Sequence, residues 1–439
     1  MSRNEIKNQI FDLVEKYYME FHHQETPSLD RIPYAGRNFD QKEMINLIDS
    51  ALDFWLTEGK YCKALEDRIQ GFLGVKFCHL VNSGSSANLI ALSALTSPTL
   101  EERRIQKADE VIVVAASFPT TINPILQIGA VPVFVDIDDS LNLDSSYLSQ
   151  ALSPKTKAVM IAHTLGSPFN FNSIKEFCEL HNLWLIEDNC DAFGAKYDGK
   201  MTGSLGDIST LSFYPSHHIT TGEGGAVITD SPKLSKLILS FRDWGRDCWC
   251  PPGKDNTCGK RFSQSFTKLP DNYDHKYIYS HIGYNLKMTD MQASIGVAQI
   301  EKLKSFVEKR IENWFFFHES LKEFNNVFLF PKTNELAEPS WFGFYLELKK
   351  DIPFRKKDLI EFLEKNNIQT RQLFSGNITR QPMFDNLELE KEYRIASPLK
   401  RSDQAMDLGF WFGVNPSFSE SQKVFIISKI KEFLSLYGY

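Results

Sequence analysis

Short, continuously apolar runs recur between about residues 75 and 230, and stretches with helical spacing separate them. The runs are Val111–Ala116, Val131–Ile137, Ala158–Ala162, Leu183–Glu187, Ile208–Phe213 and Ala226–Thr229. Runs without polar alternation are typical of strands that are buried on both faces. Their alternation with helices predicts a mostly parallel α/β sheet. Because such sheets bind ligands beyond the carboxyl ends of their strands, we look for functional residues directly after each run.

The two ends of the chain show other patterns. Ile6, Ile10, Leu13 and Tyr17 are spaced for one face of an amphipathic N-terminal helix. Beyond residue 300 we expect a long helix and then strands that alternate with amphipathic helices. These predicted elements are residues 301–321, 344–348, 356–365 and 420–435. The expected organisation is an N-terminal helical segment (1–50), a large ligand-binding domain (51–300) and a smaller α+β domain (301–439).

Composition narrows the class of protein. The chain has 439 residues, of which 42% are hydrophobic and 24% charged, the balance of a globular protein. Its formal net charge is -7 and it contains no block of Lys and Arg, so its charge does not favour a nucleic-acid partner. Charges interrupt the apolar N-terminal positions, and we find no apolar run long enough to span a bilayer. We expect a cytoplasmic protein without a membrane partner.

The first candidate motif is a turn of small residues, Asn82–Ala87 (NSGSSA), in front of an apolar helical run. Free backbone N–H groups at the start of a helix, with serine hydroxyls beside them, favour the binding of a phosphate. Ser85 and Ser86 supply these hydroxyls. The same residues also serve ordinary capping of a helix N-terminus, and the motif alone leaves both interpretations open.

The second motif follows the run Leu183–Glu187 and reads Asp188-Asn189-Cys190-Asp191. A carboxylate at the end of a buried strand can hold the protonated ring nitrogen of a pyridine cofactor, which makes the ring a good acceptor of electrons. Asp188 is the candidate for this role. The alternative interpretation is an acidic residue that caps the next helix.

The third motif follows the run Ile208–Phe213. The chain continues as Tyr-Pro-Ser-His-His and returns through a glycine-rich segment. His217 and His218 are candidate acid–base groups, since imidazole titrates near neutral pH. The motif alone favours the alternative interpretation, a pair of loop histidines that only form hydrogen bonds.

Taken in order, these motifs resemble those of the sugar aminotransferases of the DegT/DnrJ/EryC1/ArnB family. Two further matches are Ser-Phe-Pro-Thr-Thr around Phe118 and the segment Gly283–Ala293 (GYNLKMTDMQA). The resemblance covers most of the chain. It implies the α/β fold of fold type I, aspartate-aminotransferase-like enzymes, with a smaller α+β C-terminal domain. It also implies a vitamin B6 cofactor, a nucleotide-sugar substrate and a homodimer.

The resemblance assigns roles to individual residues. The residues expected at the cofactor phosphate are Ser85, Ser86 and Ser212 of one subunit and Asn285 of the other. Asp188 is expected to pair with the ring nitrogen and Phe118 to stack on the ring. Asp191, like Tyr214, differs from the aminotransferases, and we expect both to shape the cofactor site for elimination.

One residue departs from the family pattern. The family places a lysine two residues after Pro in Ser-Phe-x-Pro-Ser-Lys, where it joins the cofactor covalently, and this chain has His217 there. Imidazole forms no stable imine, so we expect a cofactor held non-covalently as pyridoxamine 5'-phosphate (PMP). His217 can still take a proton from the aminomethyl carbon of PMP. The expected chemistry is therefore loss of a hydroxyl group in place of amino transfer.

Four cysteines indicate a second cofactor. Cys190, Cys248, Cys250 and Cys258 are spaced C-x57-C-x-C-x7-C, the last three in a loop over 247–260. Four thiolates suit a 2Fe-2S cluster and equally a zinc ion, and the spacing alone does not decide. In the family, GDP-4-keto-6-deoxymannose 3-dehydratases replace the lysine and have no iron, whereas CDP-4-keto-6-deoxyglucose 3-dehydratases also carry a 2Fe-2S cluster. The chain resembles the second group at all four ligand positions.

The position of Cys190 adds an expectation of its own. It lies two residues after Asp188, so a metal that it binds would lie within roughly 10–15 Å of the cofactor. That separation suits delivery of electrons to the cofactor. The remaining cysteines, Cys62, Cys78 and Cys178, lie on apolar stretches and are expected to pack in the interior.

The resemblance implies a 3-dehydratase that removes the C3 hydroxyl of a nucleotide-linked 4-keto-6-deoxyhexose, with CDP-4-keto-6-deoxyglucose as the expected substrate. An NADH-dependent flavin/iron-sulfur reductase would supply two electrons, and the product would lead to a 3,6-dideoxyhexose of lipopolysaccharide O-antigens. A TDP-4-keto-2,6-dideoxyhexose 3-dehydratase would have the same motifs. A sugar aminotransferase with another base, and a regulatory protein that has lost the lysine, are the remaining alternatives. Arg371 and Arg380 are candidates for binding the sugar diphosphate.

Overall fold

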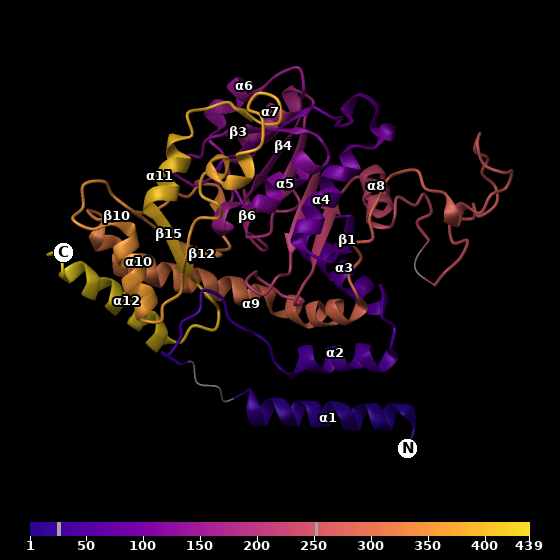
Figure 1. Ribbon diagram of the computed structural model, residues 1–439. Helices are drawn as coiled ribbons and strands as arrows, with labels where there is room; N and C mark the ends of the chain where they lie inside the picture. The colour runs from indigo at the N-terminus through magenta and orange to yellow at the C-terminus, as the bar shows by residue number, and fades with distance from the viewer. Residues whose placement is uncertain (24–27, 251–252) are drawn as a thin grey trace.

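The computed structural model describes residues 1–23, 28–250 and 253–439 and is built around an eight-stranded sheet (Figure 1). In spatial order its strands are β1 (Phe77–Val81), β9 (Gly225–Thr229), β8 (Ile208–Ser212), β5 (Trp184–Asp188), β4 (Thr156–Ala162), β2 (Glu110–Val114), β3 (Val131–Val135) and β14 (Arg394–Ile395). Strand β9 runs antiparallel to β1 and β8, and the other neighbouring pairs are parallel. The predicted mostly parallel α/β sheet is confirmed, and each of the apolar runs forms one of its strands.

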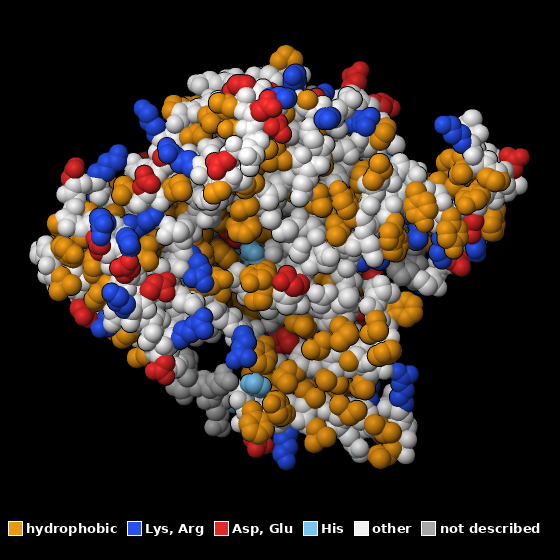
Figure 2. All heavy atoms as spheres, viewed as in Figure 1, with side chains coloured by type: hydrophobic (Ala, Val, Ile, Leu, Met, Phe, Trp, Pro, Cys, Tyr) orange, Lys and Arg blue, Asp and Glu red, His pale blue; other side chains and the backbone are white. Residues whose placement is uncertain are grey.

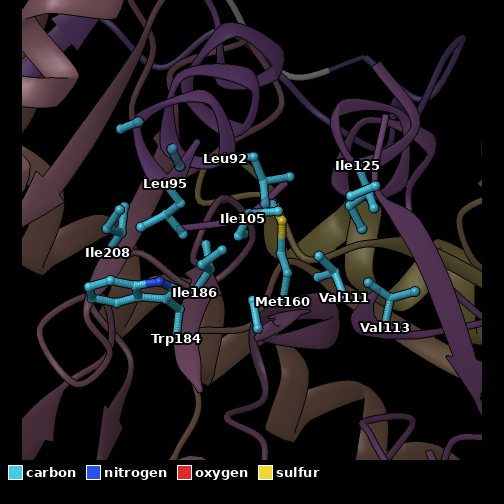
Figure 3. Packing of buried hydrophobic residues seen from close by; sticks show 14 of the residues in the cluster. Leu92, Leu95, Ile105, Val111, Val113, Ile125, Met160, Trp184, Ile186 and Ile208 are labelled. Atoms are coloured by element: carbon cyan, nitrogen blue, oxygen red, sulfur yellow. The ribbon is translucent and has the colours of Figure 1, made fainter. Parts of the chain in front are cut away.

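Both faces of this sheet are buried, which explains why the apolar runs do not alternate with polar residues. Val111 and Val113 of β2 belong to the core on one face, whereas Ile112 and Val114 belong to the core on the other face. The first core includes side chains of α4 (Gly84–Leu95), α5 (Pro119–Gln127) and α8 (Pro232–Arg242). The second includes side chains of α6 (Leu148–Ala151) and α7 (Phe171–Leu180). Figure 3 shows Leu92 and Leu95 of α4 above Ile186 of β5.

The C-terminal part forms a second, four-stranded antiparallel sheet. Its order is β10 (Phe328–Leu329), β12 (Gly343–Leu348), β15 (Gly409–Gly413) and β13 (Thr370–Arg371). Helices α10 (Lys356–Lys365) and α12 (Glu420–Ser435) have the predicted bounds and pack in one core with these strands. A further helix, α11 (Lys400–Leu408), leads into β15. Small β-strands join the two parts: β11 (Ala337–Glu338) pairs with β6 (Lys196–Tyr197), which pairs with β7 (Lys200–Met201).

A long helix, α9 (Asp290–Leu321), runs beneath both parts (Figure 1). It begins before the predicted position 301, at a capping box in which the Thr289 side chain and Gln292 satisfy each other's backbone N–H groups. The helix therefore crosses the expected domain boundary at residue 300, and β14 places residues 394–395 in the large sheet. The division into domains stays a prediction.

The chain begins with the predicted amphipathic helix, α1 (Arg3–Phe21), which lies at the edge of the molecule (Figure 1). It packs against α2 (Gln41–Asp53), which in turn packs along α9, as does α3 (Lys60–Leu73). Short 3-10 helices lie at 98–103, 145–147, 164–166, 275–277, 322–324, 378–380 and 382–384. Among the helices that the structure describes, we find none that combines the length and apolarity needed to cross a membrane.

Candidate active site

A cavity of about 660 Å³ opens at the carboxyl ends of β4, β5 and β8, in the size range of small-molecule sites. Its wall includes the start of α4, the residues after β5 and β8, and three segments of the C-terminal part. Sequence-predicted residues in this wall are Ser85, Phe118, Asp188, Cys190, Asp191, Ser212, Tyr214, His217 and Arg371. The expectation that function lies beyond the strand ends therefore led to the right edge of the sheet.

Asp188 is fixed at the end of β5 by hydrogen bonds. Its Oδ2 accepts from Asn88 Nδ2 at 2.8 Å and from Thr121 Oγ1 at 2.7 Å. Asn88 in turn accepts from Thr210 Oγ1 at 2.6 Å, so β5, β8, α4 and α5 together orient one carboxylate. A buried carboxylate held in this way is suited to pair with a ring N–H in the pocket.

The small-residue turn opens α4 at the edge of the same pocket. Ser83 is the N-cap and accepts from the Ser86 backbone N–H at 3.1 Å, which is the capping role that the sequence left open. Ser85 is exposed to the pocket and Ser212 of β8 lies across from it. Gly84 must lack a side chain because a Cβ there would overlap Ser212. Hydroxyls and helix N–H groups converge there, an arrangement that fits a phosphate.

His217 lies in the loop after β8, and a buried arginine holds that loop in place. Arg310 of α9 donates to the carbonyls of Ser216 at 3.3 Å and His217 at 3.4 Å. His218, the neighbouring candidate, is buried away from the cavity wall and its Nε2 lies 2.9 Å from the Ser340 carbonyl oxygen. Of the two histidines, His217 therefore faces the pocket and His218 has a structural hydrogen bond.

Burial sets the protonation of the acid–base groups in the pocket. It lowers the pKa of His217 to about 4, although the charge of Asp188 opposes this shift. Burial and the charge of Asp188 raise the pKa of Asp191 to about 8. His217 Nδ1 lies 3.5 Å from Asp191 Oδ1. Within the described residues, His217 Nδ1 and Asp191 Oδ2 are buried without hydrogen-bond partners. Buried polar atoms are normally paired, so these two atoms fit a site in which a bound ligand supplies the partners.

Several wall residues were not found from the sequence. Tyr34, Phe342 and Trp411 come from segments far apart in the chain, and no local motif marks them. Phe342 packs beside His217 with ring centroids 5.2 Å apart. Arg371 lies over the Tyr34 ring at 3.9 Å, and it is the arginine that the structure brings to the pocket.

Three other predicted binding residues lie outside the wall of the pocket. Ser86 has its hydroxyl engaged by Ser83 Oγ at 3.0 Å. Asn285 accepts from Lys287 Nζ at 2.7 Å at the surface. A contact between Asn285 and the cofactor of a second subunit stays a prediction. Arg380 instead pairs with Asp403, with Nε 2.6 Å from Oδ1.

The predicted metal ligands are divided between two places. Cys248, Cys250 and Cys258 line a small cavity with His275, in the segment between α8 and α9. Ligand atoms of Cys248, Cys258 and His275 all lie within 4.8 Å of one another. Cys190 instead lines the large pocket. In the described part of one chain the four cysteines thus do not form a single group, and residues 251–252 of the predicted loop lie outside that part.

The other three cysteines are buried, as the sequence predicts. Cys62, Cys78 and Cys178 have free thiols inside the hydrophobic core. Burial raises the pKa of the Cys178 thiol to about 12, so this group is inert at neutral pH.

Comparisons with known proteins agree with this geometry. The chain is 47% identical over 439 residues to lipopolysaccharide biosynthesis protein RfbH of Salmonella typhimurium, covering 99% of this chain and 100% of that protein. It is 45% identical over 434 residues to dTDP-4-dehydro-2,6-dideoxy-D-glucose 3-dehydratase of Saccharopolyspora spinosa, covering 98% and 92%. The structure of E. coli GDP-4-keto-6-deoxy-D-mannose-3-dehydratase with bound hydrated PLP superposes with a TM-score of 0.81 at 29% identity, covering 91% and 98%.

The fold, the pocket and these relatives define an enzyme of the nucleotide-sugar 3-dehydratase and aminotransferase class, with pyridoxal or pyridoxamine phosphate as cofactor. The predicted fold type I is confirmed. Residues 38–431 match the model of the DegT/DnrJ/EryC1/StrS aminotransferase family, and the chain belongs to that family.

Proposed function

We propose that this chain is a PMP-dependent, iron-sulfur 3-dehydratase that removes the C3 hydroxyl of a nucleotide-linked 4-keto-6-deoxyhexose. One observation carries the proposal. His217 stands in the wall of the cofactor pocket at the position where the family pattern has lysine, and its Nδ1 is buried without a partner in the described structure. A group that cannot hold the cofactor covalently but can accept a proton favours elimination over amino transfer.

The overall reaction balances as a reductive deoxygenation. The C3–O bond breaks and the oxygen leaves as water, while a new C3–H bond forms and the C4 ketone is retained. One NADH and one proton supply the two electrons and two protons that this requires. A separate flavin/iron-sulfur reductase is the proposed source of the electrons, as the family resemblance implies.

PMP, when bound, supplies an amino group for the sugar ketone and a ring that takes up electrons. Asp188 would hold a proton at the ring nitrogen, and the hydrogen bonds from Asn88 and Thr121 to its Oδ2 support this role because they orient the carboxylate. His217, kept neutral by burial, would take the proton from the aminomethyl carbon. Ser85 and Ser212 would hold the phosphate, and Phe118, exposed at the mouth, would stack on the ring.

The iron-sulfur part of the proposal rests on the thiols. Three of the four proposed ligands, Cys248, Cys250 and Cys258, line one cavity, and the fourth, Cys190, lies two residues from Asp188 in the cofactor pocket. A 2Fe-2S cluster held by four thiolates would carry electrons one at a time. An absorption spectrum and the iron and zinc content of protein purified without oxygen test this part. Iron with labile sulfide supports it, and a colourless zinc protein contradicts it.

For the nucleotide we propose CDP, with CDP-4-keto-6-deoxyglucose as substrate and a 3,6-dideoxyhexose as the end of the route. The 47% identity to a lipopolysaccharide biosynthesis protein supports a product of this kind. A TDP-linked 2,6-dideoxy keto sugar is the second candidate, because the chain is 45% identical to a dTDP-sugar 3-dehydratase. We further propose that the enzyme works in the cytoplasm as a homodimer.

Incubation without oxygen tests the reaction and the nucleotide together. The enzyme would be mixed with PMP, a flavin/iron-sulfur reductase, NADH and either the CDP- or the TDP-linked keto sugar. Faster loss of the C3 oxygen from the CDP sugar is expected. Faster conversion of the TDP sugar would show that the substrate is TDP-linked and would leave the proposed reaction unchanged. A parallel incubation with PLP and glutamate tests the alternative, and an amino sugar formed there would replace the proposal with an aminotransferase.

A further inference from the structure

The segment that carries three of the cysteines projects from the body of the subunit. We call residues 244–284 the arm; its residues 251–252 lie outside the described part. Figure 1 shows the arm extending away from the sheet, on the side of α8 and opposite the C-terminal part. Contacts between its own side chains link distant residues of the arm. His275 Nε2 lies 2.8 Å from Asp247 Oδ2, and Arg261 pairs with Asp274 at 3.0 Å.

The base of the arm fixes the direction in which it points. Arg246 bridges to Tyr279, and Gly245 has a φ of 80°, a conformation that favours glycine. A Cβ on Gly245 would overlap the carbonyl group of His281, and one on Gly283 would overlap the backbone of Gly245. The two passes of the chain are therefore in backbone contact at this point. Beyond this contact the described arm extends away from the sheet (Figure 1).

The arm also carries an apolar surface that no other described residue of the same subunit covers. Ile282 is 96% exposed. Other exposed side chains are Trp249, Phe262, Tyr273, Tyr277 and Tyr279. Figure 2 shows hydrophobic side chains gathered on this projection at the right of the molecule. Exposed apolar groups at this density mark a surface that another molecule covers.

The thiols of the arm and the thiol of the pocket together make one set of four ligands. The arm gathers three thiols, and the pocket of each subunit holds one more, Cys190, with no other cysteine in its wall. A second copy of the chain supplies the missing group in both directions, because a two-fold interface pairs each arm with the opposite pocket.

We propose that the metal site is completed between two subunits, with Cys248, Cys250 and Cys258 of one arm and Cys190 of the partner subunit. This inference rests on the proposed function for the identity of the metal, but its geometry does not depend on iron. Each dimer then holds two sites, and each site lies next to the cofactor of the subunit that supplies Cys190. The apolar surface of the arm becomes the contact with the partner.

His275 is the competing fourth ligand. Its Nδ1 lies 3.7 Å from Cys258 Sγ, and Asp247 holds its other ring nitrogen, the arrangement common for metal-bound histidine. With His275 as a ligand, one arm would bind the metal alone. In the proposed site His275 stays outside the ligand set, with its Nδ1 beside the Cys258 sulfur.

Mixed dimers separate these two arrangements. Subunits with Cys190→Ser and Cys258→Ser would be produced together under different affinity tags, and the mixed dimer reconstituted with iron and sulfide without oxygen. We expect each variant alone to bind almost no iron and the mixed dimer to bind half the wild-type amount, with the electron paramagnetic resonance signal of the reduced wild-type cluster. A mixed dimer without iron would place all ligands in one chain. Full iron in the Cys190→Ser dimer would assign the fourth position to His275. Either result overturns the proposal.

Oxidation of metal-free protein tests the geometry without iron. A disulfide between Cys190 and an arm cysteine is expected to give covalent dimers on a non-reducing gel, since bridging needs Cα atoms within about 7 Å. These dimers should disappear in Cys190→Ser and persist in the control Cys178→Ala. The same disulfide found within a monomer, or covalent dimers that survive Cys190→Ser, would contradict the proposal. If the wild-type protein takes up zinc and the covalent dimers still form, the iron-sulfur function fails and the shared site stands.

Discussion

The cofactor pocket and the arm are built in opposite ways. The pocket assembles its polar groups at the ends of β5 and β8 and the start of α4, where buried hydrogen bonds such as Asn88 to Asp188 fix their orientation. The arm gathers its thiols on irregular chain, with one 3-10 turn at His275–Tyr277 and a largely exposed surface. The groups proposed for proton chemistry are therefore held within one folded chain, whereas the metal site, as we propose it, depends on assembly of two chains.

The largest expected effect separates the two regions completely. Replacing His217 by Asn removes the proposed base, and we expect turnover to fall by about 10³-fold or more, within the range for loss of general base catalysis. Iron content and PMP affinity should stay near wild type, as titration and metal analysis would show. The exposed His181→Asn variant is the matched control. Near-normal turnover by His217→Asn would remove this residue from the mechanism.

Removing a thiol from the arm should have the converse effect. In Cys250→Ser we expect iron to fall to background and reductive turnover to be lost, because a four-thiolate cluster loses one ligand. PMP binding, followed by its absorbance, should be unchanged because the pocket wall contains no arm residue. Cys178→Ala serves as the control. A coupled loss of PMP from Cys250→Ser would show that the two regions are not independent.

A smaller effect is expected at the ring nitrogen. Asp188→Asn keeps the shape and can keep the bond with Thr121, but it loses the negative charge that stabilises a protonated ring. We predict turnover lower by about 10²-fold and weaker binding of PMP, with the metal site intact. The exposed Asp198→Asn variant should behave as wild type in the same assays. Equal rates for both variants would argue against ring pairing by Asp188.

The smallest effect is expected at the mouth of the pocket. Arg371 stacks on Tyr34, and we predict that Arg371→Ala raises KM by about 10-fold with little change in kcat, the cost of one charge-assisted hydrogen bond. The exposed Arg380→Ala variant, whose arginine pairs with Asp403, is the comparison. Steady-state kinetics with the sugar nucleotide measures both. A larger rise in KM for Arg380→Ala would assign the binding of the sugar diphosphate to Arg380 and not to Arg371.

The same contrast explains what could be predicted from the sequence. The apolar runs revealed the strands and the edge of the sheet where Asp188 and His217 meet, because burial on both faces leaves a local signal. The direction of β9 could not be read from its run, since hydrophobicity does not encode whether a neighbouring strand is parallel. The start of α9 was placed too late because its first turns carry small buried residues such as Ala293 and Gly296.

Long-range proximity was beyond the sequence. Tyr34, Phe342 and Trp411 reach the pocket from three segments that lie far along the chain from Asp188 and His217, so no local spacing relates them. The regular spacing of four cysteines predicted one site, but it carried no information about where the arm points. Only the folded chain shows that Cys190 and the arm thiols lie apart within a subunit.

Analysis of the nucleotide-sugar product formed without oxygen decides between deoxygenation and amino transfer. CDP-4-keto-6-deoxyglucose would be incubated with the enzyme, PMP, a flavin/iron-sulfur reductase and NADH, and the product analysed by mass spectrometry and by its reaction with a carbonyl reagent. We expect a product with one oxygen atom fewer and its ketone retained. A product that keeps the C3 oxygen and carries an amino group at C4 would contradict it.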